Sequence, residues 1–143
     1  MKKILTIIII AFVTSVNAQN KDVEILFSDN TLMVDVSFSN NKYIFSADDE
    51  ITCPTLVIEN PIFQTGGIML KIKGDDSNER FSIGYVTDVN DIDHTFHETE
   101  RISRTDGNKF EIDPIPEKTL FAIRYYGNPG QSNTINSIVA IRK

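Results

Sequence analysis

The 143-residue chain contains one cysteine, no tryptophan and two histidines. A single cysteine excludes an intramolecular disulfide framework, and so few cysteines and histidines exclude a Cys-ligated zinc finger. Basic residues are also in the minority, with 14 Lys and Arg against 20 Asp and Glu, which gives a net charge of −6. This balance excludes a protein that binds nucleic acid through a basic surface.

The composition that remains is that of one soluble globular domain. Hydrophobic residues make up 41% of the chain and charged residues 24%, which argues against a disordered chain and a polytopic membrane protein. Without disulfides the stability must come from a packed core, and a chain of this length can supply one. We interpret Cys53 as a small hydrophobic side chain in that core.

The first 18 residues have the layout of a secretory signal peptide. A short positive segment precedes an apolar run over residues 4–13, and small residues stand at positions −3 and −1 of a cleavage site after Ala18. Ten apolar residues are too few to form a membrane anchor. Cleavage removes two lysines and leaves a net charge of −8. We expect a bacterial protein that is secreted or periplasmic, with one domain over residues 19–143 and no membrane insertion.

After this segment the hydrophobic pattern has a period of two residues almost throughout. Leu70 and Ile72, for example, alternate with Lys71 and Lys73. About nine or ten short strands of this kind are separated by turn signals. The sequence therefore predicts an all-β fold, an antiparallel β-sandwich of jelly-roll type, with at most one helical turn near residues 89–94.

The same alternation predicts which side chains form the core. One apolar row is expected to combine Leu32, Val34, Val36 and Phe38, with Asp35 facing away. Across the whole chain the predicted core includes Val34, Val36, Leu70, Ile72, Ile83, Phe121 and Ile123.

An acidic loop follows one of the predicted strands. Calcium takes six to eight oxygen ligands, and extracellular modules use weak sites. A turn in which the same side chains bond their own backbone is the alternative, and the spacing is not that of an EF-hand. The sequence predicts a weak calcium site formed by Asp88, Asn90, Asp91 and Asp93. The nearby His94 and His97 are interpreted as solvated surface residues.

A second loop combines aromatic rings with amide side chains. Aromatic rings can stack on the C–H faces of a sugar, and amides can hydrogen-bond to its hydroxyls. The alternative is a plain connection, with Tyr125 in the core and Tyr126 on the outer face. The predicted ligand-binding residues are Tyr126, Asn128, Gln131 and Asn133. The loops around Asn90 and Asn128 are expected to form the contact edge.

Several short motifs follow one another in an order found in a known family. A Gly-x-x-Thr-Asp-x-x-Asp motif at residues 84–91 precedes the pair Thr95-Phe96, and a late strand over residues 121–125 precedes a closing segment over residues 135–139. Over residues 53–141 this order resembles the cleaved adhesin or MAM-like jelly-roll domains of secreted bacterial proteins. The family usually closes on Asp-Asp-Ile and carries tryptophans, whereas this chain has Asn136-Ser137-Ile138 and no tryptophan. The resemblance implies an adhesion or carbohydrate-binding module.

These features favour binding over catalysis. No nucleophile elbow, zincin motif or Gly-rich phosphate loop occurs in the sequence. We therefore expect an exported, non-catalytic module that binds carbohydrate or a surface glycan. The alternative is a structural or protein-interaction module of a secreted or cell-surface assembly. The expected partner is a glycan or a cell-surface protein, and not nucleic acid.

Overall fold

The computed structural model describes residues 22–24, 31–47, 53–65, 68–74, 80–101 and 109–142, so the predicted signal peptide lies outside the described residues. Two short helical segments, η1 (Pro61–Gln64) and α1 (Ile92–Thr95), accompany the strands. No helix within the described ranges is long and apolar enough to cross a membrane. The strands are β1 (Val23–Glu24), β2 (Thr31–Val34), β3 (Val36–Ser39), β4 (Lys42–Ala47), β5 (Thr55–Ile58), β6 (Ile68–Lys73), β7 (Phe81–Val86), β8 (Phe96–Arg101), β9 (Lys109–Ile112), β10 (Leu120–Tyr125), β11 (Gln131–Ile135) and β12 (Ser137–Arg142).

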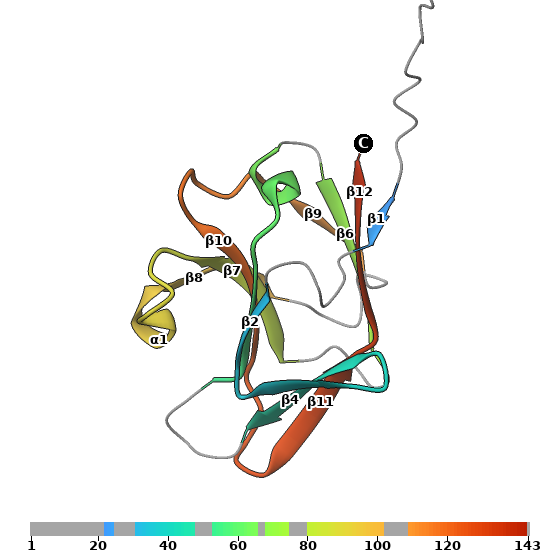
Figure 1. The fold of residues 1–143 in the computed structure, drawn as a ribbon, viewed down its shortest axis with the longest axis vertical. Coiled ribbons are helices and arrows are strands. Elements are labelled where there is room, and N and C mark those ends of the chain that lie inside the picture. Colours follow the sequence, from blue (N-terminus) through green and yellow to red (C-terminus); the bar gives the residue numbers. More distant parts are fainter. Residues whose placement is uncertain are drawn as a thin grey trace, which may run out of the picture.

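Eight of these strands form two layers with a jelly-roll order. One layer is β1-β12-β6-β9, and the other contains β5-β10-β7-β8 (Figure 1). All neighbouring strands are antiparallel. The pairs are nested along the chain: β1 pairs with β12, β5 with β10, β6 with β9, and β7 with β8. This is the order of a long hairpin folded over on itself. The predicted antiparallel β-sandwich is confirmed. A helical turn lies at α1, close to the predicted position, but the second turn, η1, was not predicted.

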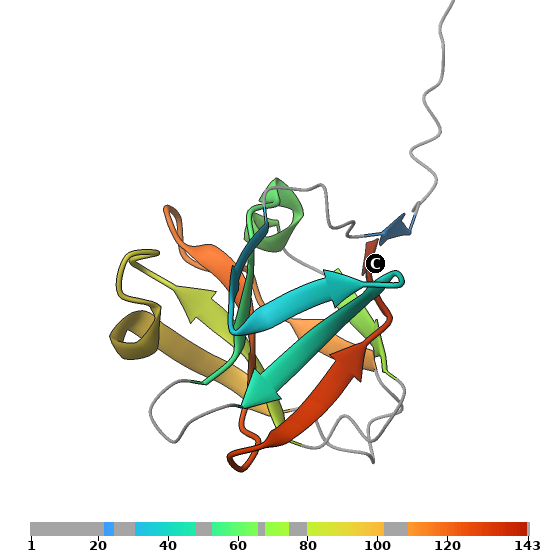
Figure 2. The same cartoon turned by 60° about the horizontal axis from the view of Figure 1, so that its bottom comes forward.

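The remaining strands extend the sandwich. β2 adds to the second layer beside β5, and β11-β4-β3 forms a smaller third sheet (Figure 2). Single residues join the sheets: Asp35 lies between β2 and β3, and Asn136 lies between β11 and β12. Asp35 has a φ of 53°, a left-handed conformation that aspartate adopts more readily than most residues. Two strands thus bend from one sheet into another around a common core.

The bend at Asp35 divides the apolar row that the sequence predicts. Leu32 is 42% exposed, and Val34 packs on a small cluster on the outer face of the β2-β5-β10-β7-β8 sheet. Val36 and Phe38, beyond the bend, pack on the main core. The prediction of one continuous row is wrong, because the left-handed residue interrupts the alternation of a regular strand. The other predicted core residues are buried in the main cluster.

The central strand β10 is covered on both faces. Phe121, Ile123 and Tyr125 point into the main core, whereas Ala122 packs on the outer face with a cluster that includes Ile92 of α1. The segment that contains α1 therefore lies across the outer face of this sheet, and it brings the acidic loop to one end of β10.

Candidate functional site

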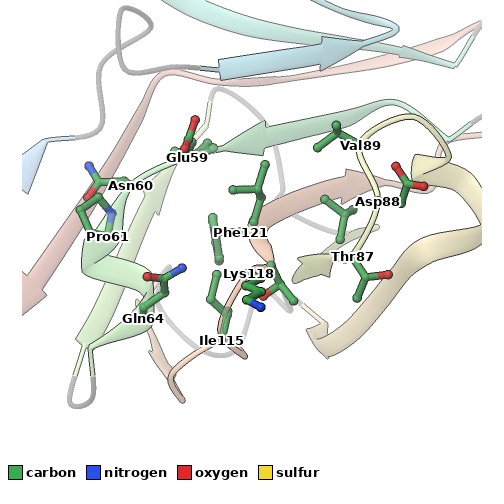
Figure 3. A pocket seen from close by; sticks show the side chains of 14 residues that line it. Glu59, Asn60, Pro61, Gln64, Thr87, Asp88, Val89, Ile115, Lys118 and Phe121 are labelled. Carbon is green, nitrogen blue, oxygen red and sulfur yellow. The ribbon is translucent and has the colours of Figure 1, made fainter.

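A pocket of about 600 Å³ opens at the end of the large sheet where β5 and β7 end and β10 begins (Figure 3). Three connections surround it, at residues 59–64, 87–89 and 115–119. Figure 3 shows Glu59 and Asp88 on opposite sides, with Phe121 between them. The floor is aliphatic and aromatic, and the rim is polar. The floor residues include Ile58, Val86, Ile115, Leu120 and Phe121, and the rim residues include Glu59, Asn60, Gln64, Asp88 and Lys118.

The first wall of the pocket is a capped helical turn. The Asn60 side-chain oxygen accepts a hydrogen bond from the Ile62 backbone N–H at 3.0 Å, and Pro61 occupies the start of η1, where no N–H is needed. Phe63 stacks on Phe121 with ring centroids 3.9 Å apart. Its carbonyl accepts from the Ile115 N–H at 2.9 Å, which ties this wall to the third connection. The first wall is thus fixed from inside the core.

The second wall is a hydrogen-bonded turn over residues 88–95. The Asp88 carboxylate accepts from the Asn90 backbone N–H at 2.9 Å, and the Asp88 carbonyl accepts from the Asp91 N–H at 3.3 Å. The Thr95 hydroxyl lies 2.9 Å from the Asp88 carbonyl oxygen and 2.7 Å from that of Asp91. Asp and Asn side chains favour such turns because they bond the neighbouring backbone. This local chemistry places Asp88 and Val89 at the pocket.

The predicted calcium residues lie along this turn, and its three carboxylates each have another contact. Asp88 bonds to Asn90, Asp91 lies 2.7 Å from His94 Nδ1, and Asp93 lies 3.4 Å from Arg124 Nη2. In the described part of the chain, no group of three or more His, Cys, Asp or Glu side chains is placed to hold a metal ion. The calcium site stays a prediction.

Calcium binding is tested by melting the protein in millimolar calcium and in chelator. A site at tenfold its Kd should stabilise the fold by about 1.4 kcal/mol through mass action. The Asp91→Asn variant should gain less, because it loses one anionic ligand. Melting curves that calcium does not change would contradict the prediction and leave the loop as an acidic turn.

The hydrogen bond that His94 donates to the Asp91 carboxylate, followed by the charge of that carboxylate, raises the pKa of His94 above its ordinary value of 6.5. A raised folded-state pKa means that the pair stabilises the fold below pH 6.5 and that this contribution is lost as the pH rises through the folded-state value. Both side chains are exposed, so the effect on stability is small.

We expect the Asp91→Asn substitution to lower the pKa of His94. An NMR titration of the histidine ring signals measures the change directly. The Glu98→Gln variant, which removes a carboxylate from the following strand, is the control and should leave the His94 titration in place. A His94 pKa that does not respond to Asp91→Asn would show that the pair does not form in solution.

The second predicted loop lies at the other end of β10. The register pairs Leu120 with Val86 and Tyr125 with Phe81, so the loops after β7 and after β10 leave the sheet at opposite ends. The structure therefore does not bring the surroundings of Asn90 and Asn128 to one contact edge.

The four predicted residues have different environments, and two of them, Gln131 and Asn133, lie on strand β11 and not in a loop. Tyr126 is 37% exposed and Asn128 is exposed, whereas Asn133 is 8% exposed and accepts a hydrogen bond from its neighbour Thr134. Gln131 Oε1 accepts from Arg80 at 2.7 Å and from the Asn128 N–H at 3.1 Å. Because the Gln131 side-chain oxygen is already engaged and Asn133 is buried, the side chains presented to a ligand here are those of Tyr126 and Asn128.

Sequence reasoning missed most of the pocket. Of its rim residues only Asp88 was a candidate, because Glu59, Gln64 and Lys118 belong to connections that are distant in sequence. The Asn60-Pro61 pair is a recognisable turn signal, but a turn signal does not say which other loop lies beside it.

A shallow hollow of about 420 Å³ adjoins the pocket on the outer face of the sheet. The two share Glu59, Val89 and Leu120. Leu32 and Val89, two large hydrophobic side chains that are 42% and 41% exposed, line this hollow. The surface thus runs from a polar pocket to an apolar patch.

In comparisons with known proteins, no family model matches this chain and no curated protein matches it significantly. The resemblance to cleaved adhesin or MAM-like domains therefore stays a hypothesis.

Proposed function

We propose that this protein is an exported, non-catalytic module that binds carbohydrate or a surface glycan in the pocket at the start of β10. The observation that carries the proposal is a polar rim over an aliphatic floor. Among the described residues, the side chains of Glu59, Gln64 and Lys118 make no hydrogen bond or ion pair, so they are available to a ligand.

Sugar chemistry fits this combination of groups. Carboxylates and amides accept and donate hydrogen bonds to hydroxyls, and C–H faces pack on apolar side chains. Asp88 and Glu59 lie on opposite sides of the pocket, which suits hydroxyls at separate positions of one ligand. Export rests on the signal-peptide layout of residues 1–18. No catalytic residue is proposed, because the site is described by binding groups alone.

The first test is a glycan array with the mature protein, followed by titration of the best array glycan against variants. Glu59→Gln and Gln64→Ala should weaken binding roughly tenfold to a hundredfold if each removes a hydrogen bond that involves a charged or well-oriented group. Tyr126→Ala is the matched control, because it removes the exposed ring of the loop at the other end of β10.

The outcome of this titration shows which of the two regions binds the glycan. Loss of binding in the pocket variants alone supports the pocket. Loss in Tyr126→Ala alone moves the site to the loop that the sequence predicts. An array without binding at high protein concentration contradicts glycan recognition.

The second candidate function is protein interaction, and the exposed Leu32 and Val89 favour it. Exposed apolar patches on small soluble domains commonly contact partners. Binding to intact cells distinguishes the two functions. Protease treatment of the cells should abolish binding if the partner is a protein, and periodate oxidation should abolish it if the partner is a glycan.

A further inference from the structure

We infer that Arg124 is a positioning residue for the pocket, because its buried guanidinium holds the turn that forms the second wall. This inference takes its functional meaning from the proposed binding function, but the position of the wall can be tested without any glycan. Arg124 lies on the outer face of β10 and is only 6% exposed. A buried cation needs partners, and its partners here are all on neighbouring elements.

The guanidinium connects the sheet to α1. Its Nε donates to the Thr55 hydroxyl of β5 at 3.0 Å, and its Nη2 donates to the Ile92 carbonyl oxygen of α1 at 2.9 Å. The Asp93 carboxylate lies 3.4 Å from the same Nη2, and the centroid of the Phe96 ring of β8 lies 4.3 Å from the Arg124 guanidinium carbon. One side chain thereby joins β5, β8, β10 and the helical turn.

A continuous set of contacts leads from α1 to the pocket. Ile92 is 6% exposed and packs with Val57, Val86 and Ala122, so the start of α1 is also fixed by apolar contact. Thr95, at its end, lies within hydrogen-bond distance of the Asp88 carbonyl oxygen and accepts from the Asp88 N–H at 3.2 Å. A displacement of α1 must therefore move the wall residue Asp88.

The shape of arginine matters more than its charge. A planar guanidinium can donate to Thr55 and Ile92 at once through separate nitrogens, whereas a lysine ammonium is a compact group that cannot span both. Buried charged pairs are weak evidence for stability and are better attested as devices that fix one arrangement. Arg124→Lys should therefore loosen the wall while the sandwich stays folded.

The experiment uses the natural lack of tryptophan. Val89→Trp places a single tryptophan on the wall, at a position that is 41% exposed, and excitation at about 295 nm would avoid the tyrosines. Adding Arg124→Lys should shift the emission to longer wavelength and raise the acrylamide quenching constant. In the chain without the reporter, Arg124→Lys should speed amide exchange at Asp91 and Thr95 by roughly tenfold to a hundredfold, because these amides bond within the wall turn.

The matched control is Ile123→Val, the adjacent residue of β10 on the core face. It should lower the melting temperature without changing the reporter emission or the exchange of the wall amides. If Arg124→Lys changes the wall no more than Ile123→Val does, the positioning role is wrong. If the wall loosens but the array shows no glycan, the positioning role stands and the proposed function fails.

Discussion

The Phe121→Ala variant is expected to lose about 3–5 kcal/mol of unfolding free energy, the usual cost of truncating a buried phenylalanine. Phe121 is 0% exposed and lies on the central strand β10. Its ring stacks on Phe63 with an interplanar angle of 7°, and both rings lie in the main core. Alanine leaves a cavity between η1 and the sheet, and neither η1 nor the sheet can fill that cavity without moving.

Urea denaturation measures this loss as a lower midpoint at an unchanged slope. Tyr126→Ala is the reference, since an exposed side chain of the same class should change stability by no more than about 0.5 kcal/mol. Because Phe121 also lines the pocket, the variant should weaken glycan binding as well. A loss in unfolding free energy below about 1 kcal/mol would mean that Phe121 is not packed as described.

Gly84→Ala is expected to be nearly as damaging, although it adds only one methyl group. A β-carbon at Gly84 would collide with the backbone carbonyl of His97 on the neighbouring strand β8. The ladder between β7 and β8 shifts register between Ile83 and Gly84, and glycine within a strand is typical of such an irregularity or of a close backbone approach. Backbone cannot rotate away as a side chain can, so we expect a cost of about 1–3 kcal/mol or more.

Thermal unfolding of Gly84→Ala should be compared with that of Ser82→Ala. Ser82 lies two residues earlier on the same face of β7, and its buried hydroxyl has no hydrogen-bond partner among the described residues. Removing an unpartnered polar atom should be close to neutral or stabilising. Equal melting temperatures for the two variants would contradict the close approach of β8.

The period of the hydrophobic pattern predicted most of the strands, because inner and outer faces alternate in a regular sheet. It missed β11 (Gln131–Ile135), whose first three residues are polar and were interpreted as a loop. Leu70 and Ile72 are buried while Lys71 and Lys73 are exposed, as that rule requires. The rule failed at Asp35, where one left-handed residue separates Val34 from Val36. Nothing in the hydrophobic pattern marks such a bend, since apolar residues continue on both sides of it.

The candidate site was less predictable than the fold. Asp88 was identified from the sequence by its acidic surroundings. Glu59 and Lys118 look like ordinary surface residues in the sequence, and only the strand order shows that the connections that contain them lie side by side. Arg124 is easier to recognise as a special residue from the sequence, because it is a charged residue within an otherwise apolar central strand. Such a residue is buried only with partners, and those partners come from segments about 30 and 70 positions away in the chain.

The place of β12 also has a consequence for how the chain folds. β12 is formed by the last described residues, yet it is an inner strand, with β1 on one side and β6 on the other. Among the described strands, β1 pairs with β12 alone, and without β12 the strand β6 would pair only with β9. Domains dominated by such distant pairings fold slowly, in milliseconds to seconds. The two layers therefore cannot be completed until β12 has paired with both of its neighbours, so we expect this pairing to be a late and slow step in the folding of the domain.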